Sequence, residues 1–203
     1  MVICCKYFVP AYLRFAGTFR IKTDKPEIFL TFDDGPSPEV TPPILNILEQ
    51  ARAKATFFCS GEKAEQYPEL LAKIKKQNHQ IGNHSYKHLN GLKTNTKKYL
   101  TNIERANNII QSALFRPPYG KIKPTQYFRL RNRYQIVFWT ILTRDFDTFT
   151  SWQQDFEKIK PHLQKGAILV FHDTLKAKEK LINLLPAILD YGKKKGFEFP
   201  VIV

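Results

Sequence analysis

The chain has 203 residues, enough for one domain with a substantial core and too few for two full catalytic units. Hydrophobic residues make up 43% of it and aromatic residues 13%, which excludes a disordered chain, and its three cysteines exclude a disulfide framework. The net charge of +14 is spread along the sequence without a basic arm or a zinc-finger spacing, so we expect no specific nucleic-acid partner.

The amino-terminal stretch is apolar and aromatic, but Lys6, Pro10 and Arg14 interrupt it. It lacks the continuous apolar run of a signal peptide, and no stretch is long enough to be a transmembrane segment. We expect residues 1–26 to be a separate segment, packed at the edge of the fold or lying as a weak interfacial helix. Residues 27–203 are expected to form one domain. Cytoplasmic and cell-envelope locations both stay open, as does the oligomeric state.

Short apolar runs alternate with longer amphipathic patterns along the rest of the chain. Two of these runs, 135–142 and 167–171, are almost wholly apolar, as parallel strands buried on both faces are. The alternation predicts about seven β-α units, arranged as a doubly wound sheet or a distorted barrel. Strands are expected at 27–32, 55–58, 80–82, 114–115, 135–142, 167–171 and 197–203. Helices are expected to start at Pro42–Pro43 and to cover 68–76, 96–112 and 176–191, the last ending at Gly192.

Polar side chains follow most of the predicted strands directly. In a parallel α/β fold the carboxyl ends of the strands share one face, so these side chains are expected to converge there. They are Asp33 and Asp34 after the first strand, His84 and His88 after the third, Arg116 after the fourth, Asp145 after the fifth, and His172 with Asp173 after the sixth.

The sequence HSYKH places His84 and His88 where one helical turn or a tight loop would present both imidazoles together. With a carboxylate from another strand end they would form a site of two histidines and one carboxylate, which leaves coordination positions open for water and substrate. Such a ligand set suits catalytic zinc, and also iron(II), cobalt, nickel or manganese. The other histidines, His79 and His162, lie in charged surroundings and are expected at the surface.

The segment TFDDGPS places two carboxylates, Asp33 and Asp34, side by side at a strand end. Adjacent ionised carboxylates repel one another, and a cation would relieve that repulsion. The turn expected at Gly35–Pro36 can aim both side chains into one cleft. One carboxylate can then ligate a metal while the other acts as a base, although a simple polar strand cap is the alternative.

Two further segments supply charged groups at the same face. Arg116 begins RPPYG, whose prolines stiffen a loop that can hold a carboxylate and aim a backbone N–H at an oxyanion. His172 follows a strand, and Asp145 can raise its pKa so that it stays protonated as an acid. A Pro-rich surface loop and a structural histidine are the plainer interpretations of these two motifs.

Taken together, these motifs resemble those of the polysaccharide deacetylases, carbohydrate esterase family four. TFDDGPS is similar to the first motif of the family, HSYKH to the second, RPPYG to the third and LVFHD to the fifth. Asp145-Phe146 lies where the fourth motif usually has Asp-Trp, and Asp147 competes for that alignment. The resemblance runs from about residue 27 to the carboxyl end, and it implies a distorted (β/α) barrel that forms a polysaccharide deacetylase-like catalytic domain.

The resemblance also implies metal-dependent removal of N-acetyl groups from a saccharide substrate that contains N-acetylglucosamine, such as peptidoglycan or chitin. By motif position, Asp34, His84 and His88 would hold the metal, most often zinc. Asp33 would be the general base, oriented by Arg116, and His172 the general acid, tuned by Asp145. The backbone N–H of Tyr119 would complete the oxyanion site.

Three other functions stay open at this point. The same ligand set would serve iron-dependent oxygenation, and the same active site could deacylate a lipid-linked sugar or another amide. A catalytically silent module that binds a carbohydrate or a polyanion through the basic surface is the third. A binding module, however, would not need an acid, a base and a metal together.

Overall fold

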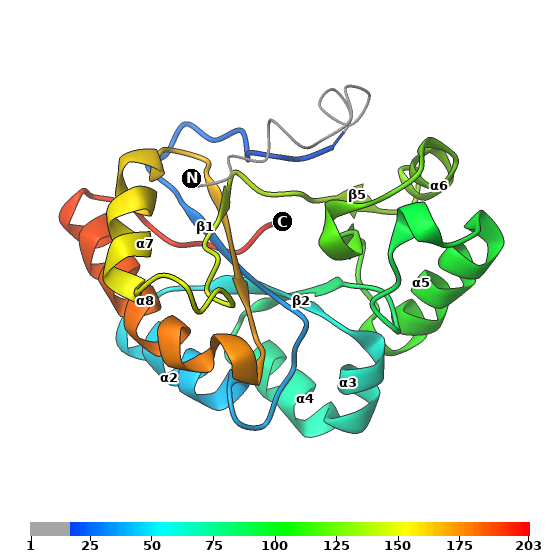
Figure 1. Ribbon diagram of the computed structural model, residues 1–203, viewed down its shortest axis with the longest axis horizontal. Helices are drawn as coiled ribbons and strands as arrows, with labels where there is room; N and C mark the ends of the chain where they lie inside the picture. The colour runs from blue at the N-terminus through cyan, green and yellow to red at the C-terminus, as the bar shows by residue number, and fades with distance from the viewer. Residues whose placement is uncertain (1–16) are drawn as a thin grey trace.

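The computed structural model describes residues 17–203, in which seven parallel strands form one curled sheet with helices on its outer side (Figure 1). The strand order is β5-β4-β3-β2-β1-β7-β6, and every neighbouring pair is parallel. The predicted distorted barrel of about seven parallel strands is therefore confirmed. The strands are β1 (Phe29–Asp33), β2 (Ala55–Cys59), β3 (Gln80–Asn83), β4 (Leu114–Phe115), β5 (Gln135–Ile136), β6 (Ile141–Leu142) and β7 (Ile168–His172).

The helices lie in an arc around the outside of the sheet, as crossover connections between parallel strands require (Figure 1). α7 and α8 lie at one end of this arc, and α5 and α6 at the other. The helices are α2 (Thr41–Gln50), α3 (Gly61–Gln66), α4 (Pro68–Lys76), α5 (Thr96–Ile110), α6 (Pro124–Leu130), α7 (Trp152–Ile159) and α8 (Leu175–Lys194), with short 3₁₀ turns η2 (Gly91–Lys93), η3 (Pro118–Gly120) and η4 (Lys160–His162).

The central strands β1, β2 and β7 are apolar because both of their faces are covered. Phe32 of β1 stacks on Phe57 of β2, with ring centroids 4.9 Å apart, and on Phe171 of β7 at 5.3 Å. All three rings are at most 1% exposed. This packing fixes the three strands relative to one another, so the polar residues that follow them are held in one place.

The apolar stretch 135–142 was predicted to be one strand, and this is wrong. Its first part, β5, pairs with β4, whereas its last part, β6, pairs with β7. These two partners lie near opposite ends of the strand order, so the residues between β5 and β6 cross from one edge of the sheet to the other. The apolar composition therefore reflects burial along the whole crossing. The sheet has to curl because its two edge strands are joined by so few residues.

The carboxyl end also differs from the prediction. α8 continues past Gly192, because the missing side chain makes room for a neighbour: a Cβ at Gly192 would lie 2.5 Å from Cζ of Phe199. The helix ends only at Lys194, before Gly196, whose φ is +79°. Residues 197–203 form no regular strand, and Glu198 makes only an isolated bridge with Glu27.

Two other expectations concern the surface and the amino-terminal segment. His79 is only 7% exposed, because it lies between Ala55 and the ring of Phe57, whereas His162 is exposed as expected. Of the segment 1–26, residues 1–16 lie outside the described part of the chain. The rest packs on the sheet, where Phe19 stacks on Phe138 with ring centroids 4.5 Å apart. Within residues 17–203, no helix has both the length and the apolarity needed to cross a membrane.

Candidate metal centre and active site

A cavity of about 600 Å³ opens at the carboxyl ends of the strands. The structure brings Asp33, Asp34, His84, His88 and His172 together there, as the sequence predicted. Arg116 and Asp145 do not line the cavity and contact Asp33 and His172 instead. The expectation for Asp173 is wrong, because its buried side chain lies outside the cavity lining and accepts a hydrogen bond from the hydroxyl of Thr41 at 2.6 Å. Asp33 ends β1, and Asp34 follows it in the left-handed conformation, with φ at +75°. The remaining lining residues are His84, His88, Tyr119, Lys121, Trp139, Leu142, Phe146, Val170, His172, Thr174 and Lys176.

Asp34, His84 and His88 point their ligand atoms toward one another, all within 4.8 Å. Oδ1 of Asp34 lies 3.1 Å from Nε2 of His88 and 3.5 Å from Nε2 of His84. Burial disfavours the charged form of Asp34, but the close polar contact with His88 and the nearby imidazoles, His172 among them, outweigh it and lower its pKa. The carboxylate is therefore ionised, as metal coordination requires.

The hydrogen bonding of His84 decides which of its nitrogens faces this cluster. Nδ1 lies 2.8 Å from the carbonyl oxygen of Arg116, which can only accept, so Nδ1 carries the proton. Burial lowers the pKa of His84 despite the nearby Asp33 and Asp34, so the ring is neutral. Its Nε2 lone pair then faces the Asp34 carboxylate. Two acceptors facing each other fit a shared cation, and the carbonyl contact is typical of the groups that orient metal-binding histidines.

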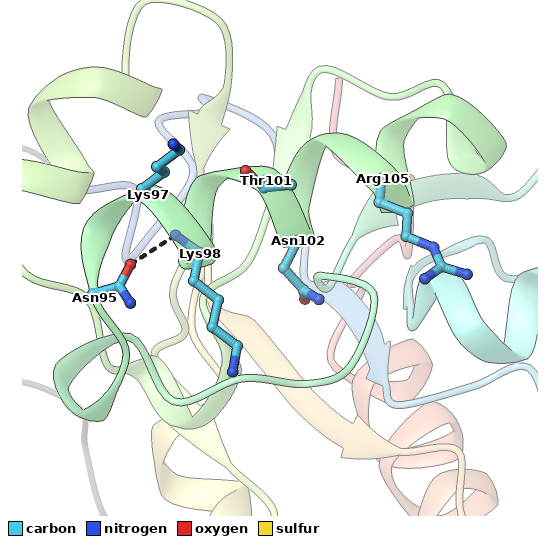
Figure 2. A pocket seen from close by; sticks show the side chains of 6 residues that line it. All are labelled: Asn95, Lys97, Lys98, Thr101, Asn102 and Arg105. Atoms are coloured by element: carbon cyan, nitrogen blue, oxygen red, sulfur yellow. Dashed lines mark hydrogen bonds between the residues drawn. The ribbon is translucent and has the colours of Figure 1, made fainter.

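The loop that carries both histidines is neither a helical turn nor a regular strand extension. Ser85 and His88 have positive φ values of 62° and 49°, and a side chain from α5 supports the loop. Oδ1 of Asn102 accepts hydrogen bonds from the backbone N–H groups of Tyr86 at 3.0 Å and of Lys87 at 3.1 Å. Figure 2 shows Asn102 on α5 between Thr101 and Arg105. Sequence reasoning missed Asn102 because it is distant from the HSYKH motif in the chain.

Arg116 holds Asp33 from beneath the cavity. Its Nη1 lies 2.7 Å from Oδ1 of Asp33 and donates to the hydroxyl of Thr31, also at 2.7 Å. The guanidinium is fully buried, and its other nitrogens donate to backbone carbonyls of Val137 and Phe138. Asp33 is therefore held in one orientation, and its other oxygen, Oδ2, lies 3.9 Å from Nε2 of His84.

His172 and Asp145 form the second charged pair. Nδ1 of His172 lies 2.8 Å from Oδ1 of Asp145, so Nε2 is left for the cavity. Burial disfavours the imidazolium, but the charge and hydrogen bond of Asp145, helped by Asp33 and Asp34, raise the pKa of His172 to about 9. The ring is therefore protonated at neutral pH, as a group that donates a proton needs to be.

The alternative alignment for the fourth motif can be compared directly with this pair. Asp147 forms an ion pair with Arg144 and accepts a hydrogen bond from the backbone N–H of Phe149 at 3.0 Å. It is Asp145 whose carboxylate contacts His172. The ring of Phe146 stands edge-on to that of His172, with centroids 4.8 Å apart. Phe146 therefore supplies an aromatic wall to the cavity, but it lacks the N–H donor of the tryptophan that is usual at this position of the motif.

Tyr119 lines the cavity and lies in the 3₁₀ turn η3, which begins at Pro118 of the RPPYG segment. Its φ is +60°, and its ring is 59% exposed and stands edge-on to His88 at 4.5 Å between centroids. The left-handed conformation turns the backbone at this residue beside the histidine cluster. Sequence reasoning missed the apolar residues of the cavity wall, because apolar side chains carry no chemical signal: Trp139, Leu142 and Val170.

Comparison with known proteins decides the family. The model of the family described as polysaccharide deacetylase matches residues 20–135, which is more than half of the chain. The chain belongs to the polysaccharide deacetylase family. A peptidoglycan-N-acetylglucosamine deacetylase of Bacillus cereus is 33% identical over 199 residues, covering 92% of this chain and 70% of that protein.

Solved structures of other polysaccharide deacetylases have the same fold. A peptidoglycan N-acetylglucosamine deacetylase in complex with 4-naphthalen-1-yl-N-oxidanyl-benzamide superposes with a TM-score of 0.90 at 31% identity, covering 96% of this chain and 95% of that one. A mutant of a carbohydrate esterase family four pseudoenzyme, described as having restored activity, superposes at 0.81 with 24% identity, covering 91% and 68%. Because the fold also occurs in a pseudoenzyme, the activity of this chain has to be argued from its own residues.

Proposed function

We propose that this chain is a metal-dependent hydrolase that removes N-acetyl groups from N-acetylglucosamine units of a peptidoglycan-like or chitin-like saccharide. One observation carries the proposal. The ligand cluster Asp34, His84 and His88 shares one open cavity with an oriented carboxylate, Asp33, and a protonated imidazole, His172. A divalent ion, most often zinc at such sites, would polarise the acetamide carbonyl and acidify a water molecule there.

Asp33 is suited to the role of general base. It is paired with and oriented by Arg116, and its second oxygen lies beside the ligand cluster. It can therefore accept a proton from the attacking water as the C–O bond forms. Because its partner guanidinium is fully buried and held by two backbone carbonyls, the carboxylate keeps its position during this transfer.

His172 is suited to the role of general acid. An amine is a poor leaving group unless its nitrogen is protonated as the C–N bond breaks. His172 carries the required proton at neutral pH, and Asp145 fixes the ring so that Nε2 is the donor. We assign to the backbone N–H of Tyr119 the stabilisation of negative charge on the carbonyl oxygen.

The family relationship supports the substrate class. The Bacillus cereus relative is a peptidoglycan-N-acetylglucosamine deacetylase, and a chitooligosaccharide deacetylase of Azorhizobium caulinodans is 31% identical over 163 residues. The cavity volume of about 600 Å³ is sufficient for an N-acetylated sugar unit, and its openness to solvent lets a longer chain continue past it.

The test is an acetate-release assay on N-acetylglucosamine oligomers and peptidoglycan fragments, with chelator and with metal add-back. We expect release that chelator abolishes and metal restores. Asp33→Asn should lower kcat by about 10²–10⁴-fold while metal content stays near normal, as expected for loss of a general base. His84→Ala should lose the metal, and Glu49→Gln, an exposed change on α2, should leave both unchanged.

Three results would contradict the proposal. Metal-loaded protein that releases no acetate from either substrate would exclude this function. Oxygen uptake with iron(II) and without acetate release would favour oxygenation instead. Polyanion binding that is sensitive to salt and insensitive to chelator, again without acetate release, would favour a binding module.

A further inference from the structure

Two lysines enter the cavity from opposite ends of the curled sheet. Lys121 follows the 3₁₀ turn after β4, and Lys176 lies in the first turn of α8, after β7. Both side chains line the cavity, and both residues are exposed. Both lysines therefore lie at the wall of the cavity that holds Asp33, Asp34 and His172.

The acidic groups of the site are already occupied by other partners. Asp33 pairs with Arg116, Asp145 pairs with His172, and Asp34 faces the two metal-binding histidines. Among residues 17–203, neither Lys121 nor Lys176 forms an ion pair with a carboxylate. Nζ of Lys176 lies 6.0 Å from the ring centroid of Phe146, at the cavity wall. The rim of the cavity therefore carries two lysines that form no direct ion pair within residues 17–203.

The basic residues around a second hollow do not converge in this way. A hollow of about 480 Å³ lies on the face of α5, and Figure 2 shows its cationic side chains, Lys97, Lys98 and Arg105. Lys97 points away from Lys98, and Arg105 contacts Glu65 at 3.6 Å and donates to the hydroxyl of Tyr86 at 2.6 Å. These cations are dispersed or already paired, so much of the +14 charge belongs to ordinary solvated surface.

We propose that Lys121 and Lys176 recognise an anionic group, a carboxylate or a phosphate, that the saccharide carries close to the reacting N-acetyl group. This rests on the proposed deacetylase function and names a preferred substrate class. Ammonium groups act as point charges and bind either anion. The position of Lys176 in the first turn of α8 adds the positive end of the helix dipole on its side of the cavity.

Binding can be measured apart from turnover by calorimetry on metal-loaded protein that carries Asp33→Asn. The ligands are a neutral N-acetylglucosamine oligomer, an oligomer of equal length in which alternate units carry a carboxylate ether, and a phosphorylated N-acetylglucosamine. We expect the anionic ligands to bind more tightly, and the difference between the two anionic ligands identifies the preferred group. Adding Lys121→Gln and Lys176→Gln should reduce the anionic-to-neutral preference about fivefold, because exposed ion pairs are weak.

Lys176→Arg, which retains the charge, should preserve the preference, and Lys97→Gln, which removes one exposed charge on α5, should do the same. In the active protein, the loss should be in KM for the anionic substrate and should diminish at high salt. Equal affinity for neutral and anionic ligands in the parent protein, or equal losses for both in the double lysine variant, would overturn the inference. If acetate release fails on every substrate while the anionic preference persists, the deacetylase proposal fails and the recognition site stands.

Discussion

Both carboxylate oxygens of Asp145 are used by one residue, His172: Oδ1 bonds the ring nitrogen at 2.8 Å, and Oδ2 accepts the backbone N–H at 2.6 Å. A carboxylate held at two points on the same neighbour cannot rotate away from the ring. The contact therefore fixes the orientation of the imidazole and stabilises its charge at the same time, which a single hydrogen bond would do less well.

Asp145→Asn should lower the pKa of His172, because the burial that disfavours imidazolium remains while the largest favourable charge is lost. In chelator-treated wild-type protein, NMR titration of the ring should give a pKa of about 9, above the usual histidine value of 6.5. A raised pKa stabilises the fold fully below about pH 6.5, and this contribution is lost as pH rises through about 9. In the variant, the pH at which this stabilisation is lost should be lower. The pH above which kcat decreases should be lower as well. An unchanged ring pKa in the variant would contradict the assignment.

Arg116→Met should destabilise the protein, because it leaves the buried carboxylate of Asp33 without its partner. We expect a loss of about 3–5 kcal/mol, the range for breaking a buried ion pair. Urea unfolding of Arg116→Met, Asp33→Asn and the double variant gives the coupling between the two residues. As a control, Arg133→Met breaks an exposed pair with Glu104 and should cost at most about 1 kcal/mol. Additive effects of the two active-site changes would refute the coupling.

Asn102→Ala should weaken metal binding, although Asn102 is not a ligand. It removes the acceptor that bonds the backbone N–H groups of Tyr86 and Lys87, so the loop carrying His84 and His88 becomes less rigid. Loss of a group that orients metal ligands typically costs 10–100-fold in affinity, and competition with a chromophoric chelator measures it. Thr101→Ala, the exposed neighbour on α5, is the matched control. Equal zinc affinity in the two variants would show that the loop is held by other contacts.

His79 should make the fold sensitive to acid. Burial, with a smaller effect of Lys54, lowers its pKa to about 4, and its Nδ1 accepts the backbone N–H of Ala55 at 3.2 Å. In the unfolded chain His79 binds a proton near pH 6.5, whereas in the folded chain it binds one only near pH 4. The free energy of unfolding therefore falls as pH drops from about 6.5 toward 4.

Urea midpoints at pH 7 and pH 4.5 test this expectation. The fall in midpoint should be smaller in His79→Gln than in the wild type, whereas His162→Gln, at an exposed histidine, should behave as the wild type does. A wild-type fall that His79→Gln reproduces in full would assign the acid sensitivity to other groups.

Sequence reasoning located the site because its residues follow strands, and parallel strands place their carboxyl ends on one face. It assigned the fourth motif to Asp145 without excluding Asp147, and only the tertiary structure shows that Asp145 is the carboxylate that contacts His172. It also missed α6 and α7, which have seven and eight residues and too few turns for a clear apolar stripe.

The split of 135–142 was hidden for a different physical reason. Periodicity reports how apolar a segment is, but not which partner each part of it pairs with. Polar contacts over long sequence separations, such as those of Arg116 with Val137 and Phe138, have no local signature either. The candidate catalytic and metal-binding residues could therefore be proposed from the motifs. The contacts that orient those residues could be identified only from the tertiary structure.

The residues between β5 and β6 join the two margins of the sheet, and the carbonyls of Val137 and Phe138 among them receive the guanidinium of Arg116. A change in the length of this crossing would therefore move Arg116, and with it the carboxylate of Asp33 that Arg116 orients. The altered residues would nevertheless be distant from Asp33 in the sequence. Engineers who wish to reshape the cavity should therefore leave residues 137–140 at their present length.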